Sequence, residues 1–157
     1  MSVETWELLS YIVTVVGFPL AICVFLYEQR KERENEDEEV YQLLSDNYQD
    51  FLKVALENPD LRLFSPGETT DLEPQQRERR LIIFNMLVSL FERAYLVLYD
   101  TSMSPKQARR WRSWEDYMGE WCNRQDFRAA LPDLLRGEDP EFVSYIQKLS
   151  EQQGLVR

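Results

Sequence analysis

Histidine is absent from this chain of 157 residues, and cysteine occurs only twice. Without histidine, the chain cannot form a Ser/His/Asp or Cys/His nucleophilic system, a His-ligated metal site or the Arg/His motif of helical ribonucleases. Cys23 and Cys122 lack the spacing of a metal-ligand pair, and no glycine-rich loop is present to cradle a phosphate. We therefore expect no enzyme activity, no metal site and no cofactor.

Glycine and proline are also scarce, with five and seven residues respectively. This scarcity favours helices over a hairpin-rich sheet. Hydrophobic residues make up 44% of the chain and aromatic residues 13%, which indicates a buried core rather than disorder. The sequence predicts an all-α protein, with enough residues after position 27 for one compact domain.

Charged residues are missing altogether from residues 8–27 (LLSYIVTVVGFPLAICVFLY). A helix of about 20 residues rises about 30 Å, which matches the hydrocarbon thickness of a bilayer. Buried helices of soluble proteins rarely stay free of charge over such a length. We predict that this segment is a transmembrane helix that anchors the chain in a lipid bilayer.

The charges that flank this apolar run differ in sign. Glu4 and Glu7 precede it, whereas Arg30, Lys31 and Arg33 follow it. Because an excess of Lys and Arg marks the cytoplasmic side of a span, we expect the N-terminus outside and the domain in the cytoplasm. A cleaved signal peptide would show the reverse order, with positive charge before the apolar run. A reducing cytoplasm would keep both cysteines as thiols.

Small residues recur within the predicted span at spacings of four, three and four, at Ser10, Thr14, Gly17 and Ala21. This spacing places them on one helical stripe, where a second helix can approach closely. We expect the stripe to mediate self-association into a homo-oligomer. The alternative is that the stripe is chance, since small residues are common in membrane spans. Pro19 removes a backbone hydrogen bond and should kink or loosen the helix midway.

No glycine or proline occurs between Leu20 and Asn58, so we expect the helix to continue from the membrane into the cytoplasm. Residues 28–39 (EQRKERENEDEE) should form a charged juxtamembrane helix. Its charges are most simply a solvated face, and alternatively a cation or docking site. The predicted organisation is a tail and transmembrane helix over residues 1–27, this juxtamembrane helix, and a cytoplasmic helical domain over residues 40–157.

The domain begins with an amphipathic pattern. One helical face carries apolar and aromatic side chains at helical spacing, namely Tyr41, Leu44, Tyr48, Phe51 and Ala55. Asn58 should end this helix, because a residue before proline is disfavoured in the helical region. Residues 61–64 are expected to form a short strand or turn, and residues 65–74 a polar loop.

A second helix is expected over residues 75–99, with its most apolar part at residues 81–91. We considered this part as a second span, but Glu92 and Arg93 interrupt it, and Asn85 and Ser89 share a face with Glu92. We therefore interpret it as the central helix of the domain. Partial burial would raise the pKa of Glu92 unless an arginine such as Arg93 compensated it, and a structural salt bridge is the simpler expectation.

Start signals predict three further helices. Ser104 should cap one of them with Pro105 in its first position, and Asp126 and Asp139 should open two more. The helix after Ser104 carries an aromatic stripe, formed by Trp111, Trp114, Tyr117 or Met118, and Trp121. A stripe of this kind is far more often core than ligand site.

Basic residues are concentrated in residues 76–112, which hold eight bases and three acids, whereas residues 28–75 hold fourteen acids and five bases. We hypothesise that the basic region faces the acidic juxtamembrane helix of the same or a neighbouring chain, a protein partner, or an anionic ligand. The candidate ligand-binding residues could stack on and clamp a nucleotide or phosphate: Arg109, Arg110, Arg112, Trp111 and Trp114. The alternative is that these arginines are solvated flanks of a core stripe. The net charge of −10 argues against nucleic acid as the main partner.

Short residue groups follow the span and the charged helix in order: Tyr48 and Phe51, residues 57–61 (ENPDL), Glu92 and Tyr95, Trp111 and Trp114, Phe127 and Arg128, and Phe142 and Ile146. This order resembles a large group of uncharacterised bacterial membrane-anchored helical proteins. The resemblance implies a bacterial inner-membrane location and a helical cytoplasmic domain, without an established reaction. The layout is also similar to small CRISPR-associated membrane proteins that assemble into pores and depolarise infected cells.

We predict a single-pass inner-membrane protein that self-associates and uses its cytoplasmic helical domain for partner binding or signalling. One alternative is a homo-oligomeric pore that acts as an antiviral effector, in which Ser10 and Thr14 would supply the only polar lining. Another alternative is a membrane-anchored nucleotide sensor that uses the Arg/Trp region.

Overall fold

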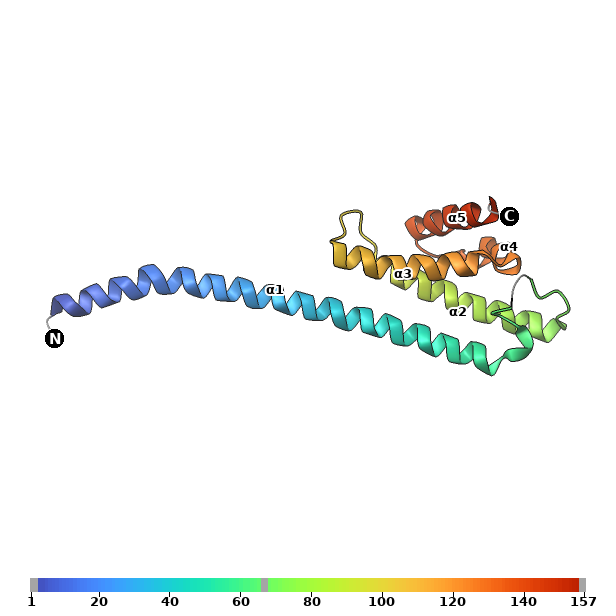
Figure 1. Ribbon diagram of the computed structural model, residues 1–157, viewed down its shortest axis with the longest axis horizontal. Helices are drawn as coiled ribbons and strands as arrows, with labels where there is room; N and C mark the ends of the chain where they lie inside the picture. Colours follow the sequence, from blue (N-terminus) through green and yellow to red (C-terminus); the bar gives the residue numbers. More distant parts are fainter. Residues whose placement is uncertain (1–2, 66–67, 156–157) are drawn as a thin grey trace. The chain divides into compact units, whose positions relative to one another are not determined.

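The computed structural model describes the backbone of residues 3–65 and 68–155, and the side chains of residues 17–33, 35–65 and 68–154. The described chain is helical and contains no strand, which confirms the predicted all-α class (Figure 1). Its elements are α1 (Val3–Glu57), the short 3-10 helix η1 (Pro59–Leu61), α2 (Pro74–Leu98), α3 (Pro105–Cys122), α4 (Gln125–Leu134) and α5 (Pro140–Leu155).

Helix α1 is 55 residues long and includes Pro19 in its interior. It runs through residues 28–39 and ends at Glu57, directly before Asn58 and Pro59, as the sequence predicts. The chain divides into two compact units, residues 1–42 and residues 43–157. Helix α1 therefore supplies residues 3–42 to the first unit and the opening helix, residues 43–57, to the second.

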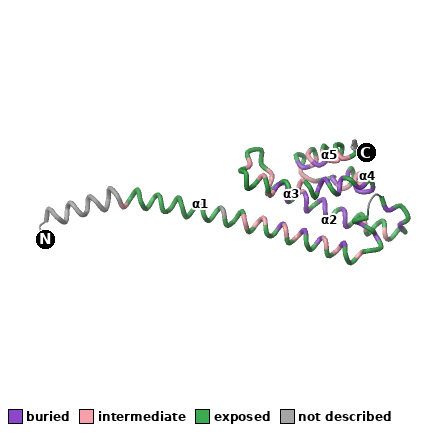
Figure 2. Tube along the Cα trace, viewed as in Figure 1, coloured by how far each residue is buried: buried purple, intermediate pink, exposed green. Residues whose placement is uncertain are grey.

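In the first unit, the part of α1 just before the charged segment exposes apolar side chains around its whole circumference (Figure 2). Seven large side chains within residues 18–27 are between 44% and 69% exposed: Phe18, Leu20, Ile22, Val24, Phe25, Leu26 and Tyr27. An amphipathic helix of a globular domain would instead bury one stripe of such residues. Within the described part of the first unit, these side chains stay exposed on every face of the helix.

In the second unit, α1 buries one face. Leu44, Tyr48, Phe51 and Ala55 are each at most 9% exposed, which confirms the predicted core face at these four positions. Tyr41, which the pattern placed on the same face, belongs to the first unit and is half-buried. Ring contacts join α1 to α3, with Tyr48 against Trp114 at 5.9 Å and Phe51 against Trp121 at 5.6 Å between ring centroids.

Helix α2 is the central helix of the second unit and contacts α3, α4 and α5. Phe84, Leu87, Val88, Phe91 and Ala94 are fully buried on its inner side. Among the described residues, α2 is the one helix that is both long enough and apolar enough to cross a membrane. However, 44% of its most apolar window is buried inside the domain, which agrees with its interpretation as a core helix.

Local signals fix the helix starts. The Ser104 hydroxyl accepts the N–H of Gln107 at the start of α3, and the Asp139 carboxylate accepts the N–H groups of Glu141 and Phe142 at the start of α5, as predicted. The prediction that Asp126 opens a helix as its cap is wrong. Helix α4 begins at Gln125 with Arg124 in the capping position. The Asp126 carboxylate lies within the first turn, where it accepts the N–H of Phe127 and pairs with arginine side chains.

The connection between α1 and α2 contains a turn at residues 63–64, which confirms the turn alternative of the sequence expectation, and the described part of residues 65–73 is a loop. Residues 59–61 form the 3-10 helix η1 rather than part of a strand, and Arg62 ends it with a left-handed backbone at φ 49°. Leu61 and Leu63 point into the core, with exposed fractions of 0% and 3%. The connection is therefore anchored by apolar burial and does not lie free on the surface.

Candidate functional site

The two tryptophans of the predicted ligand site lie in the core. Trp111 is 4% exposed and Trp114 is 2% exposed. The ring of Trp111 contacts three tyrosine rings at centroid distances of 5.1 to 5.9 Å, those of Tyr95, Tyr99 and Tyr145. Trp114 contacts Tyr48 and Tyr117. The aromatic stripe of α3 is therefore core, and its ring faces are occupied by the protein's own side chains.

The three arginines of the predicted site lie on the other faces of α3. Arg109 and Arg112 are exposed, and Arg110 is half-buried. Because Trp111 and Trp114 point inwards, the structure does not bring guanidinium groups and indole faces together at the surface. Anion binding by these five residues stays a prediction, and stacking on the indoles would require the core to open.

The basic region of residues 76–112 does not form one uniform surface. Arg79 pairs with Asp60 of η1, and Arg80 pairs with Asp126 of α4 at 2.8 Å. The Arg80 guanidinium also donates to the carbonyl of Thr69 at 2.9 Å. Arg80 is thus neutralised by a buried acid of the second unit, whereas the Arg79–Asp60 pair is exposed, with side chains 45% and 40% exposed.

Sequence reasoning missed a buried ionic cluster around Arg124 and Asp126, which are 6% and 5% exposed. The two side chains pair at 2.7 Å, and Arg80 adds a second guanidinium to the same carboxylate. Arg124 also donates to three backbone carbonyls of the α1–α2 connection, those of Arg62, Leu63 and Ser65. The cluster therefore fixes this connection against α2 and α4 and has a structural role.

Glu92, the acid singled out in the apolar helix, meets another acid. Its carboxylate accepts the backbone N–H of Asp139 at 2.5 Å, and it shares a hydrogen bond with the Glu138 side chain. This hydrogen bond, together with partial burial and the Glu92 charge, raises the pKa of Glu138 to about 7. The expected salt bridge between Glu92 and a neighbouring arginine is therefore replaced by a carboxyl pair that holds a proton up to near-neutral pH.

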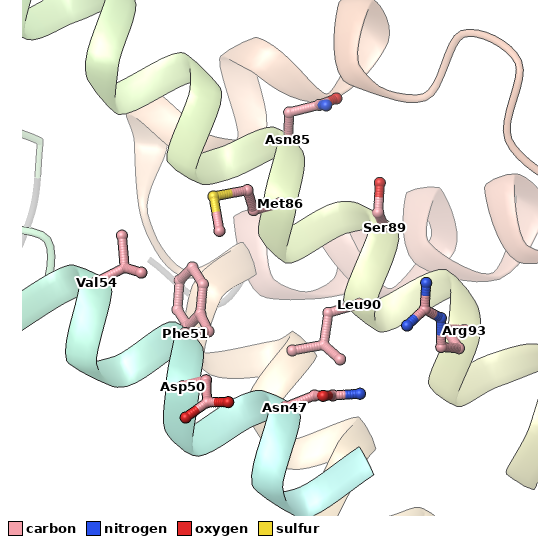
Figure 3. A pocket seen from close by; sticks show the side chains of 9 residues that line it. All are labelled: Asn47, Asp50, Phe51, Val54, Asn85, Met86, Ser89, Leu90 and Arg93. Carbon is pink, nitrogen blue, oxygen red and sulfur yellow. The ribbon is translucent and has the colours of Figure 1, made fainter. Parts of the chain in front are cut away.

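A groove of about 410 Å³ lies between α1 and α2 within the second unit (Figure 3). The lining residues are Asn47, Asp50, Phe51 and Val54 of α1 and Asn85, Met86, Ser89, Leu90 and Arg93 of α2. Val54 lies at the end near Met86, and Asn47 lies at the end near Arg93, so the two helices run antiparallel along it. We call this feature the α1–α2 groove.

The α1–α2 groove continues into an exposed apolar surface. Ile82 and Met86 are 57% and 45% exposed, and beyond Arg93 the side chains of Leu96 and Val97 are 57% and 51% exposed. Leu43 of α1 is 60% exposed. On α2 the residues Ile82, Met86, Ser89, Arg93 and Leu96 recur at spacings of four, three, four and three. This is the spacing of a coiled-coil seam, and it was the available sequence signal for the groove.

The predicted small-residue stripe falls partly outside the described side chains. Ser10 and Thr14 lie outside them, whereas Gly17 is half-buried and Ala21 is exposed on α1. Within the described residues, no cluster of three or more His, Cys, Asp or Glu side chains could hold a metal ion.

The fold and these surfaces define a class of protein: an all-helical chain in which one long helix links an exposed apolar segment to a small helical domain. No protein-family model, no curated protein and no solved structure matches the chain.

Proposed function

We propose that this chain is a single-pass protein of the bacterial inner membrane that self-associates and uses its cytoplasmic helical domain to bind a partner or transmit a signal. The domain has no enzymatic role in this proposal. Its observed surfaces are an α1–α2 groove and an exposed apolar face, which suit helix binding rather than chemistry.

The exposure of residues 18–27 carries the proposal. In water, seven large apolar side chains that are 44% to 69% exposed would be costly, because each buried aliphatic or aromatic side chain is worth about 1.5–3 kcal/mol. A bilayer removes that cost, since lipid tails cover every face of the helix at once. The bases that follow, Arg30, Lys31 and Arg33, support a cytoplasmic position for the domain.

Membrane fractionation with alkaline extraction tests this proposal. The full chain, expressed in a bacterium, should stay in the extracted membrane pellet. A variant with Phe18→Arg and Ile22→Arg should move to the soluble fraction, because each central arginine costs about 2.5–3.5 kcal/mol of insertion free energy.

Leu56→Arg is the matched control, because Leu56 is the most exposed large apolar residue among the described side chains of the second unit, at 79%. This variant should remain in the pellet. An unmodified chain that alkaline extraction releases completely would contradict the membrane proposal.

A further inference from the structure

The α1–α2 groove combines features that suit a helical partner. Its floor is apolar, with Phe51, Leu90 and Met86, and its two walls are unbroken helices. Along the α1 wall, Leu43, Asn47, Asp50 and Val54 recur at spacings of four, three and four, which matches the seam on α2. Two parallel seams of this spacing are the surface that one half of a four-helix bundle presents to the other half.

The groove also carries one charge of each sign, one on each wall. Arg93 of α2 is exposed and makes no ion pair among the residues that the structure describes. Asp50 of α1 is paired with Lys53 at 2.7 Å, but both side chains are 69% exposed. An exposed pair of this kind contributes little to stability, so Asp50 can exchange Lys53 for another base.

We propose that the occupant of the α1–α2 groove is the same groove of a second copy of this chain, so that two α1–α2 hairpins form a four-helix bundle. A two-fold interface requires a surface that is complementary to itself. In the first arrangement, the two-fold axis runs along the groove, between the two copies. Rotation about this axis keeps each residue at the same position along the groove and places α1 of one copy opposite α2 of the other. Arg93 of one copy then faces the wall that carries Asn47 and Asp50 of the other. The apolar members of the two seams, such as Leu43, Val54, Met86 and Leu96, lie on either side of this contact.

The opposite arrangement, with an axis across the groove, fits less well. This rotation reverses the positions of residues along the groove. Arg93 would then face the Val54 end of the partner's groove, where the lining offers no acid. The same rotation would also direct the two copies of residue 43 to opposite ends of the bundle. Two chains anchored in one membrane need these ends on the same side, and this last argument alone rests on the proposed function.

Charge reversal with heterodimer rescue tests the pairing in the full chain. The parent for the test carries Cys23→Ser and Ser89→Cys, so that one reactive thiol lies in the groove. Cys122 does not interfere, because it is buried and burial raises the pKa of its thiol to about 12. A short bismaleimide then reports pairing as a covalent dimer in detergent solution.

We expect the parent to form the covalent dimer, and Asp50→Arg or Arg93→Asp alone to lower its yield about ten-fold, since like charges then face each other. Co-expression of the two variants with different tags should restore the dimer as a mixed species, because each copy supplies the charge that the other lacks. Restored pairing in the mixture also shows that both variants are folded.

The control is Asp133→Arg, which changes an exposed residue of α4 paired with Arg136 and should leave the dimer yield unchanged. Equal yields from the parent, both reversals and their mixture would overturn the pairing, as would a parent that forms no covalent dimer. Membrane fractionation plays no part in this readout, so the groove and the membrane proposal can fail separately.

Discussion

Helix α1 contributes to both units, and similar side chains differ in burial between its two segments. Phe25 in the first unit is 62% exposed, whereas Phe51 in the second unit is 4% exposed, although both lie on one uninterrupted helix. Around Phe51 the apolar residues form one stripe that meets α3, and around Phe25 they cover all faces. The contrast indicates that packing in the domain buries the apolar side chains of the second segment. In our proposal a lipid bilayer covers those of the first segment.

Truncating these two phenylalanines gives the largest expected difference. Phe51→Ala should lower the free energy of unfolding of the domain by about 3–5 kcal/mol, because it leaves a cavity against Trp121. Phe25→Ala should change that free energy by less than about 0.5 kcal/mol, as an exposed position does. Chemical denaturation followed by tryptophan fluorescence measures both. Similar losses from the two variants would show that the segments share one environment.

The stability of the second unit also depends on a buried ionic cluster. The described part of the first unit contains no such cluster. Asp126→Ala would leave Arg124 and Arg80 without their shared carboxylate, and we expect a loss of about 3 kcal/mol in unfolding free energy. The control Asp133→Ala removes an exposed ion pair with Arg136 and should cost less than about 1 kcal/mol. Equal small losses would mean that the cluster does not fix the α1–α2 connection.

The local features of the fold are those that sequence could predict. Ser104, Asp139 and the Asn58–Pro59 step act on the backbone within a few residues, so their effects follow from the chain itself. Asp126 looked like the same kind of cap. Its role was mispredicted because Arg80, which is 46 residues away in sequence, competes for the carboxylate, and only the folded chain brings them together.

The candidate sites depended even more on the tertiary fold. Spacing predicted that Trp111 and Trp114 share a core stripe, but it could not show that tyrosines from other helices cover their rings. Residues 81–91 of α2 are apolar on nearly every side of the helix. The sequence pattern therefore does not distinguish the buried face of α2 from the face that stays exposed. The position of the α1–α2 groove therefore could not be predicted from sequence, because the groove forms only where the fold brings α1 beside α2.

The smallest expected effect concerns the Glu92–Glu138 pair of the second unit. We expect this pair to make the free energy of unfolding of the second unit depend on pH. The ordinary pKa of Glu138 is 4.5 and the folded value is about 7, so between these values the folded domain keeps a proton that the unfolded chain has released. The free energy of unfolding should therefore fall as the pH rises through this window and stay level above it. Partial exposure of Glu138 limits the change to about 1 kcal/mol.

Denaturation at pH 5 and pH 8 measures this effect. Glu138→Gln should abolish the fall, because the amide can donate to Glu92 at both pH values without titrating. Glu141→Gln changes a nearby exposed acid, in the first turn of α5, and should leave the fall intact. An unchanged pH dependence in Glu138→Gln would assign the effect to another group.

The most direct test of the account is the reactivity of Cys23, which is exposed on α1 within the apolar segment. A thiol needs water to ionise and react, so a membrane-impermeant maleimide should not modify Cys23 in sealed vesicles of either orientation, and should modify it after denaturation. With Cys23→Ser, a Leu56→Cys probe in the domain should react in inverted vesicles only. Rapid modification of Cys23 in intact vesicles would contradict the claim that this segment lies within the bilayer.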